Sequence, residues 1–517
     1  MFQIYTKIKG GVIVSYVLLS FICILALIII CRYTQMNYKM MRSIKIFKKH
    51  KEKMDFNCHE NLLHICVPCL REQSIIEQTI DELLKATNQI QKNVIIYIVT
   101  TQKENYDKER YRPKIQEFTD RLISKVSAMK LNEKYGFLFS LDDIEKMDSY
   151  ISTHNMIDRN QIEQYILDYY DKKPSTNEVV EKYIVEHPSC NITLLNYPNH
   201  ICSMASQLNY CYRWILENKE VSAKDYFMVY NADCQPNPNT FKLLFQKIIQ
   251  NKKVRVFQLI RAYTLNYDKY IGLKGFFLKA SALYQTRWSL GSEYPMYERY
   301  NIKSAANNQR SYYMIGHGMT FSLELLKSIN GFHETTNLED LYVGYVLSYC
   351  REKVIPIPAL ENTLNPLSVK SWAKQKIVWF AGMYDVFNYP TYIKENVSEP
   401  INKKWANKLR FQFFIRDTLP WLLGPTSVLL FMLLSIIVCK IFFYIGIFLV
   451  LINSVFCGIY LLHQLKKLNA IPKNEHGNFF GLIVGIIIYS LLRNLPSIYY
   501  VINRTFNKSM EKFKTER

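Results

Sequence analysis

The chain has 517 residues, of which 49% are hydrophobic and 21% charged, so it can bury a sizeable core without disulfide bonds. Its 65 lysines and arginines outnumber 44 aspartates and glutamates, which gives a net charge of +21. Much of this excess lies beside apolar segments, and no nucleic-acid-binding signature accompanies it. Retention on one side of a membrane explains the charge, and nucleic acid is not expected as a partner.

The first predicted element is an apolar, uncharged stretch from Gly11 to Cys31, which is long enough to cross a bilayer. A secretory signal peptide is the alternative, but the stretch is long for one and no small-residue cleavage site follows it. Residues 1–32 are therefore predicted to be a transmembrane anchor and residues 33–60 a basic juxtamembrane linker. Because lysines and arginines in short loops stay on the cytosolic side, the long region beyond is predicted to be cytosolic.

Residues 61–370 are predicted to form an α/β domain. Strand-length apolar runs alternate with helical patterns, and the runs are Leu62–Val67, Val94–Val99, Ile192–Leu195 and Tyr226–Tyr230. This alternation predicts a mostly parallel sheet flanked by helices, with ligands at the carboxyl edge of the strands. Residues 105–187 are polar and charge-dense with helical spacing, which indicates an inserted helical subdomain.

The first strand ends in the turn Val67-Pro68-Cys69-Leu70-Arg71-Glu72. This turn resembles the opening of family 2 glycosyltransferases, which have the GT-A fold and use the loop to cradle the nucleotide of a nucleotide-sugar donor. The resemblance implies that Pro68, Arg71 and Glu72 contact the donor. Members usually have acidic residues after the second strand to recognise the base, and Glu104 is the candidate for that contact here.

A carboxylate follows the run Tyr226–Tyr230, in the order Asn231, Ala232, Asp233 and then a proline-rich turn. A diphosphate leaving group must be neutralised as its bond to the sugar breaks, and a divalent cation on carboxylate oxygen does this. The pattern resembles the D-x-D motif of the same family, with Asn231 in the first position. The resemblance implies that Asp233 binds Mg²⁺ or Mn²⁺ and that Asn231 bonds the ribose or a metal-bound water; helix capping is the alternative role for Asp233.

His317 lies between two glycines on an apolar run. Neutral imidazole can ligate a metal, so His317 is a second candidate ligand, with a purely structural histidine as the alternative.

Two adjacent acids, Glu339 and Asp340, follow Gly331-Phe332 and precede a helical pattern. An acceptor hydroxyl is a poor nucleophile until a positioned carboxylate takes its proton, so Asp340 is the candidate general base. The segment resembles the G-G-F…T-E-D stretch of the family, in which the aspartate has this role. Glu339 is expected to orient the loop or bond the acceptor; simple capping of the helix is the alternative.

The last motif, Gln375-Lys376-Ile377-Val378-Trp379, resembles the Q-x-x-R-W motif of membrane synthases related to cellulose and hyaluronan synthases. The resemblance implies that Trp379 stacks on the acceptor sugar and that Gln375 addresses the donor. Val378 replaces the arginine, so Lys374 or Lys376 is expected to meet the diphosphate. The alternative for Trp379 is an interfacial anchor.

Residues 371–418 are predicted to be interfacial amphipathic helices, because aromatic and aliphatic residues alternate there with lysines and arginines. Residues 419–503 contain three apolar segments, 419–439, 441–462 and 479–503, and residues 504–517 form a basic tail. The first two segments are predicted to form a transmembrane hairpin. Because the basic tail prefers the cytosol, the last segment either crosses, re-enters or lies at the interface.

Together the resemblances imply a glycosyltransferase of hexosyltransferase type, acting at the cytosolic face of the cell membrane in cell-surface polysaccharide synthesis, and the family resemblance implies that it is inverting. The expected donor is a nucleotide-diphosphate sugar, and the expected acceptor is a growing polysaccharide or a lipid-linked saccharide. Three or four spans make a thin channel, so an oligomer or an export partner is expected alongside membrane lipid. The alternative is a catalytically lapsed subunit that binds and assembles a synthesis complex. Asn231 and Val378 prompt this alternative, and retention of Asp340 argues against it.

Overall fold

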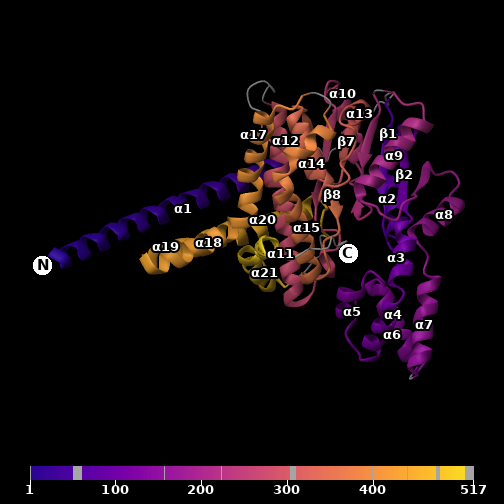
Figure 1. Ribbon diagram of the computed structural model, residues 1–517, viewed down its shortest axis with the longest axis horizontal. Coiled ribbons are helices and arrows are strands. Elements are labelled where there is room, and N and C mark those ends of the chain that lie inside the picture. The colour runs from indigo at the N-terminus through magenta and orange to yellow at the C-terminus, as the bar shows by residue number, and fades with distance from the viewer. Residues whose placement is uncertain are drawn as a thin grey trace.

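The computed structural model describes residues 2–49, 61–156, 158–222, 224–302, 310–397, 400–438, 440–472 and 478–506. Residues 50–60 of the predicted linker and 507–517 of the predicted tail lie outside the described residues. Figure 1 shows an α/β body from which the long helix α1 (Phe2–Lys49) projects, with α18 (Leu419–Val438) and α19 (Lys440–Val450) beside it. Helix α1 therefore includes residues 33–49 of the predicted linker.

The body is built on one mixed sheet with the strand order β3-β2-β1-β4-β7-β6-β8-β5. Strands β3, β2, β1 and β4 are parallel neighbours, β7 is antiparallel to β4 and β6, and β6 is parallel to β8. The four apolar runs of the sequence form β1 to β4. The strand bounds are β1 Leu63–Pro68, β2 Val94–Thr101, β3 Ile192–Tyr197, β4 Tyr226–Val229, β5 Cys234–Gln235, β6 Val256–Ala262, β7 Met319–Ser322 and β8 Val354–Thr363.

Hydrophobic cores cover both faces of the sheet because successive side chains of a strand point to opposite faces. Leu63, Ile65 and Val67 of β1 belong to one core, and Cys66 between them belongs to the other. The flanking helices and their neighbours are α2 Ile76–Thr87, α8 Thr176–Glu186, α9 Met204–Asn218, α10 Thr240–Gln250, α11 Gly272–Trp288, α12 Tyr294–Ile302, α13 Leu323–Ser328, α14 Glu339–Tyr349, α15 Val369–Tyr384, α16 Tyr389–Tyr392 and α17 Lys403–Phe413.

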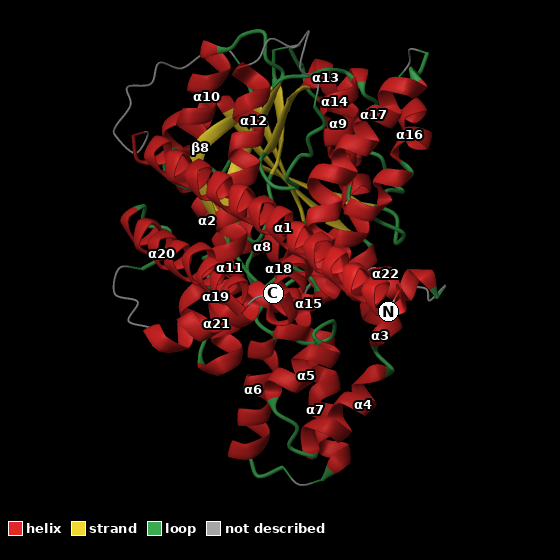
Figure 2. Ribbon diagram, turned by 90° about the vertical axis from the view of Figure 1, so that its left-hand side faces the viewer, coloured by secondary structure: helices red, strands yellow, loops and turns green. Residues whose placement is uncertain are grey.

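The polar stretch 105–187 is helical and includes a small core of its own. Figure 2 shows helices α4 to α7 as a lobe that projects away from the sheet. Phe118, Phe139 and Ile166 are fully buried within that lobe. The helices of this region are α3 Lys103–Tyr111, α4 Lys114–Ile123, α5 Ala128–Tyr135, α6 Leu141–Thr153, α7 Arg159–Lys172 and α8.

Four helical stretches of the described chain are long and apolar enough to cross a membrane: Leu19–Lys49, Lys403–Ile437, Lys440–Lys467 and Phe479–Thr505. Helices α1, α18 and α19 share a core formed by Ile22, Ile29 and Phe431 with their neighbours. The third stretch is made of α19, a π-helical segment at Leu451–Phe456 and α20 (Cys457–Lys467).

The last apolar segment is divided in two. Helix α21 (Phe479–Leu492) ends at Arg493, and α22 (Leu495–Thr505) begins after Asn494, whose amide donates to the Leu422 carbonyl at 2.7 Å. At 14 residues α21 is about 21 Å long, which is less than the hydrocarbon thickness of about 30 Å. Helix α21 packs against α11, and its glycines Gly481 and Gly485 lie so close to Phe276 that a Cβ at either position would clash with it.

The predicted interfacial region 371–418 is partly interior. In α15 the side chains of Trp372, Gln375 and Lys376 are at most 4% exposed. This half of the region therefore packs against the body, and its polar groups face the site described next.

Candidate functional site

The predicted motifs meet at the carboxyl edge of the sheet. Cys66 of β1 pairs with Val229 of β4, so Pro68 and Asn231 lie at the same level, two residues further along adjacent strands. Strand β7 is antiparallel and enters the sheet at this edge, where the Gly318 amide donates to the Val229 carbonyl at 2.7 Å. The turn after β1, the turn after β4 and the segment before β7 are therefore neighbours.

The turn after β1 is held by Glu104. Its carboxylate accepts the backbone N–H of Arg71 at 3.0 Å and that of Thr176 at 2.9 Å, and the Glu72 N–H donates to the Thr176 hydroxyl at 2.9 Å. Arg71 has a φ of 58°, a left-handed conformation that these contacts stabilise. Glu104 thus links the turn to α8, while its contact with a nucleotide base stays a prediction.

Gln207 was missed by the sequence reasoning as a positioning residue. Its side-chain amide donates to the carbonyls of Cys69 at 2.8 Å and Val99 at 2.7 Å, so it joins the ends of β1 and β2 from helix α9. A buried glutamine on a helix has no local sequence signal for this contact.

His317 lies against the end of β4 and is fully buried. The Asn231 N–H donates to Nδ1 of His317 at 3.2 Å, which leaves the proton of the neutral ring on Nε2. Nε2 lies 3.8 Å from Oε2 of the equally buried Glu361, and burial lowers the pKa of His317. A protonated Nε2 cannot ligate a cation, so we leave His317 out of the proposed metal site.

Glu361 organises this side of the edge. It accepts the hydroxyl of Tyr230 at 2.8 Å, the N–H of Asn237 at 3.0 Å and the hydroxyl of Thr240. The sequence reasoning did not identify Glu361, because its partners lie 121 to 131 positions earlier in the chain. The contacts tie β8 to the proline-rich turn after Asp233.

Asp233 is 3% exposed, and its carboxylate accepts the Thr363 hydroxyl at 3.3 Å. Among the described residues, no three His, Cys, Asp or Glu side chains are grouped to hold one cation. Mg²⁺ in phosphoryl sites is commonly held by one or two carboxylates together with substrate phosphates. A single carboxylate at Asp233 fits that ligand set, so it can hold a divalent cation only together with a donor diphosphate.

Asp340 lies on the other side of the segment Gly316–Gly318. Its Oδ1 accepts the Leu341 N–H at 2.8 Å, and the Gly316 backbone also donates to its carboxylate. A Cβ on Gly316 would lie 3.0 Å from Oδ2 of Asp340. Burial raises the pKa of Asp340, although both N–H groups and the charge of Arg261 favour its ionised form. Asp340 and the neighbouring Glu339, at the start of α14, are both partly exposed.

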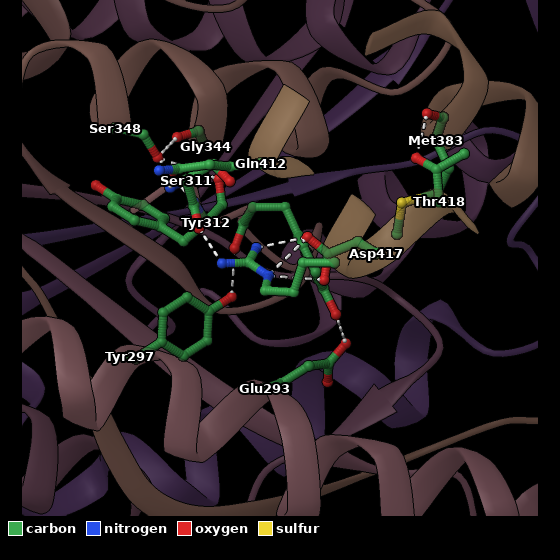
Figure 3. A network of polar contacts seen from close by, with 12 residues as sticks. Glu293, Tyr297, Ser311, Tyr312, Gly344, Ser348, Met383, Gln412, Asp417 and Thr418 are labelled. Atoms are coloured by element: carbon green, nitrogen blue, oxygen red, sulfur yellow. Dashed lines mark hydrogen bonds and ion pairs between the residues drawn. The ribbon is translucent and has the colours of Figure 1, made fainter. Parts of the chain in front are cut away.

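Arg261 and Glu293 complete the polar cluster, and neither was singled out in the sequence. Arg261, near the end of β6, interacts electrostatically with both Glu293 and Asp340. Glu293 accepts the hydroxyls of Ser289 at 2.8 Å and Tyr313 at 3.2 Å. Figure 3 shows Glu293 at the edge of a wider network of polar contacts that includes Tyr297 and Asp417. Burial raises the pKa of Glu293, and Arg261 opposes that shift.

The predicted motif at residues 375–379 lies on helix α15, beside the same cluster. The Lys376 ammonium lies 3.7 Å from the centre of the Trp379 ring and donates to Oε1 of Gln285 at 3.1 Å. Burial and the charge of Arg261 lower the pKa of Lys376 well below its usual value. Trp379 packs on Tyr263, with ring centres 6.1 Å apart, and remains partly exposed. Gln375 is buried, and its Oε1 has no hydrogen-bond partner in the described chain.

The edge therefore contains two groups of predicted residues. Arg71, Glu72 and Glu104 are joined in the turn after β1. The other group contains Asn231, Asp340 and Trp379. Its members are connected through the Gly316–Gly318 segment, Arg261 and Lys376.

No family model matches the sequence, and no curated protein matches it. Among solved structures, the mannosyltransferase PcManGT from Pyrobaculum calidifontis, in complex with GDP-Man and Mn²⁺, is 10% identical, with 92% of this chain and 99% of that chain covered and a TM-score of 0.39. S. aureus TarS 1–349 in complex with UDP-GlcNAc is 9% identical, with 86% and 92% covered and a TM-score of 0.33. Similarities this distant do not identify the reaction, which has to be argued from the residues of this chain.

Proposed function

We propose that the chain is an inverting glycosyltransferase of hexosyltransferase type with a GT-A domain. It moves a sugar from a nucleotide-diphosphate donor to a saccharide or lipid-linked acceptor at the cytosolic face of the cell membrane, in polysaccharide synthesis. The observation that best supports this proposal is the environment of Asp340. Burial raises the pKa of its carboxylate, two backbone amides position it, and the three-residue segment Gly316–Gly318 separates it from the end of β4.

Asp340 is the general base of this proposal. The acceptor hydroxyl gives its proton to the Asp340 carboxylate while its oxygen attacks the anomeric carbon, and the bond from that carbon to the diphosphate breaks. A base works best when its pKa lies near the operating pH, and burial moves the pKa of Asp340 in that direction. The Leu341 and Gly316 amides keep the carboxylate oriented without removing its basicity.

Positive charge near the leaving nucleoside diphosphate stabilises the negative charge that develops on it. Arg261 and Lys376 supply this positive charge from β6 and α15, and Lys376 takes the place of the arginine that the motif lacks at Val378. Lys376 has a lowered pKa in the described structure, and a nearby dianion favours its protonated form. Asp233, together with the diphosphate, would hold a divalent cation, which would supply further positive charge against the developing charge of the leaving group.

The acceptor site is assigned to Trp379, which packs against the buried ring of Tyr263. Aromatic faces suit the apolar faces of sugar rings, and the Trp379 ring is partly exposed and in contact with Lys376 of the charged cluster. An acceptor sugar stacked there lies close to the groups that we assign to the donor.

The full-length chain in nanodiscs tests the proposal. Nucleotide release is measured from a panel of nucleotide sugars, with and without Mg²⁺ or Mn²⁺. We expect metal-dependent release from one donor, loss of release in Asp340→Asn with donor binding retained, and weaker metal-dependent donor binding in Asp233→Ala. Asp268→Asn, an exposed aspartate after β6, is the matched control and should behave as the unaltered protein.

Nucleotide-sugar binding without release from any donor, with acceptor lipid supplied, would replace this proposal by the assembly-subunit alternative. Absence of nucleotide-sugar binding would reject both.

A further inference from the structure

Three arginines converge where the membrane helices meet the body. Arg32 belongs to α1, Arg287 to α11, and Arg493 follows α21. The Arg493 guanidinium lies 3.8 Å from the centre of the Tyr284 ring, and that of Arg287 lies 5.9 Å from the Tyr33 ring. Arg32 interacts electrostatically with both tyrosines and with Arg493. We call these three residues the arginine cluster.

Arg287 lies deepest and is 3% exposed. It donates to the Asn453 carbonyl at 2.6 Å and to Oδ1 of Asn37 at 2.5 Å, and both of these acceptors are neutral. Its Nε has no hydrogen-bond partner in the described chain. A buried guanidinium without an anion is costly, so this environment is completed best by a negative ligand.

The protein supplies little negative charge to the cluster. Among the described residues, no carboxylate oxygen lies within 4.0 Å of any of the three guanidinium groups. The carboxylate that interacts with Arg32 from a greater distance is Asp417, and Arg416 already pairs with it at 2.5 Å (Figure 3). Three like charges that repel one another without a counter-charge indicate an anion-binding site.

The position of the cluster indicates where the anion comes from. Arg32 is the first charge after the apolar stretch Gly11–Cys31, and Arg493 is the first after the apolar helix α21. Charges at the ends of apolar helices lie at the level of lipid head groups. A small cavity between α11, α20 and α21 opens beside Arg287, lined also by Tyr284, Ser454 and Ser490.

The cluster is also close to the catalytic cleft. Helix α11 carries Gln285, which accepts the Lys376 ammonium, between Tyr284 and Arg287. Helix α11 therefore contributes both to the arginine cluster and to the contact with Lys376, so one helix links the cluster to the site where we place the acceptor.

We propose that Arg32, Arg287 and Arg493 bind the phosphate or diphosphate of a lipid-linked acceptor. The inference deepens the proposed function, because it assigns the acceptor class of the same site. Of the two acceptors expected from the sequence, it selects the lipid-linked one.

Binding of tritiated farnesyl phosphate to the full-length chain in phosphatidylcholine nanodiscs tests this site without any donor. We expect saturable binding that farnesol and inorganic phosphate do not displace. Arg32→Gln and Arg493→Gln should each weaken binding about tenfold or more, as expected for loss of a charged hydrogen-bond donor. Arg504→Gln is the matched control, because Arg504 is an exposed arginine over another tyrosine ring, that of Tyr384.

Arg287→Gln would also remove the contacts to Asn37 and Asn453, so Arg32 and Arg493 provide the test. Equal displacement by phosphatidylglycerol would reassign the cluster to general anionic lipid, and displacement by inorganic phosphate would reassign it to a free anion; either overturns the proposal. Unchanged binding in both variants also overturns it. Because donor-dependent nucleotide release is measured separately, its failure would count against the proposed function and not against this site.

Discussion

Replacing Gly316 by alanine tests the assignment of Asp340 as the base without removing the carboxylate. The new Cβ would lie 3.0 Å from Oδ2 of Asp340, whereas carbon and oxygen atoms in close contact are usually about 3.3–3.6 Å apart. The carboxylate or the loop must therefore move by about 0.3–0.6 Å. Since a misplacement of about 1 Å can cost about 10²-fold in rate, we expect kcat to fall roughly tenfold.

The assay is nucleotide release at saturating donor and acceptor, with the donor Kd measured on the same preparation. The donor Kd should stay unchanged, because Asp340 is assigned to the acceptor proton. The Gly316 N–H favours the ionised carboxylate, so a weaker contact also moves the acid side of the pH profile to higher pH. An unchanged kcat, or a loss explained by donor affinity alone, would refute the proposed geometry.

Three further predictions concern the same cleft. Asp340→Asn should reduce kcat by about 10²–10⁴-fold. In the unaltered chain, kcat/KM should fall as the pH drops through the pKa of Asp340, because only the ionised carboxylate accepts a proton. Burial raises that pKa, so the fall should begin at a higher pH than for an exposed aspartate, whose pKa is about 3.9; an acid limb at or below that value would contradict it. Because burial lowers the pKa of Lys376, binding of a nucleoside diphosphate should be accompanied by proton uptake, measured by calorimetry in buffers of different ionisation enthalpy. Lys376→Met should remove this uptake and Lys370→Met, an exposed lysine at the start of α15, should retain it. Trp379→Ala should raise the acceptor KM and leave the donor KM unchanged, with Trp379→Phe intermediate; equal effects on both substrates would indicate that Trp379 only holds α15 in place.

Much of the candidate site could be anticipated because strand ends are visible in the sequence. The apolar runs before Pro68 and Asn231 become β1 and β4, and parallel strands place their carboxyl ends at one edge. Asp340 was recognised from its position after a glycine-phenylalanine pair and before a helical pattern, and the structure places it beside Gly316. Local order along the chain was sufficient to select these residues, and their roles stay predictions.

The partners of these residues could not be anticipated. His317 was a candidate metal ligand on the basis of its flanking glycines, but its ring nitrogens face Asn231 and Glu361, which lie 86 and 44 positions away. Arg261 and Glu293 come from a strand and a π-helical segment that share no local pattern. Their mutual charge effects exist only after the sheet has formed.

The sequence by itself determined the apolar helices, the alternation of strands and helices, and the acids at strand and helix ends, because hydropathy and periodicity are local properties of the chain. Only the tertiary structure decided which charges are buried, which have a partner, and where the last apolar segment is divided. Arg32, Arg287 and Arg493 illustrate the difference: in the sequence they are isolated charges near apolar stretches, and in the fold they are neighbours around Tyr284 and Tyr33. The cause is physical, since the free energy of a charge depends on its burial and on the groups that packing brings against it.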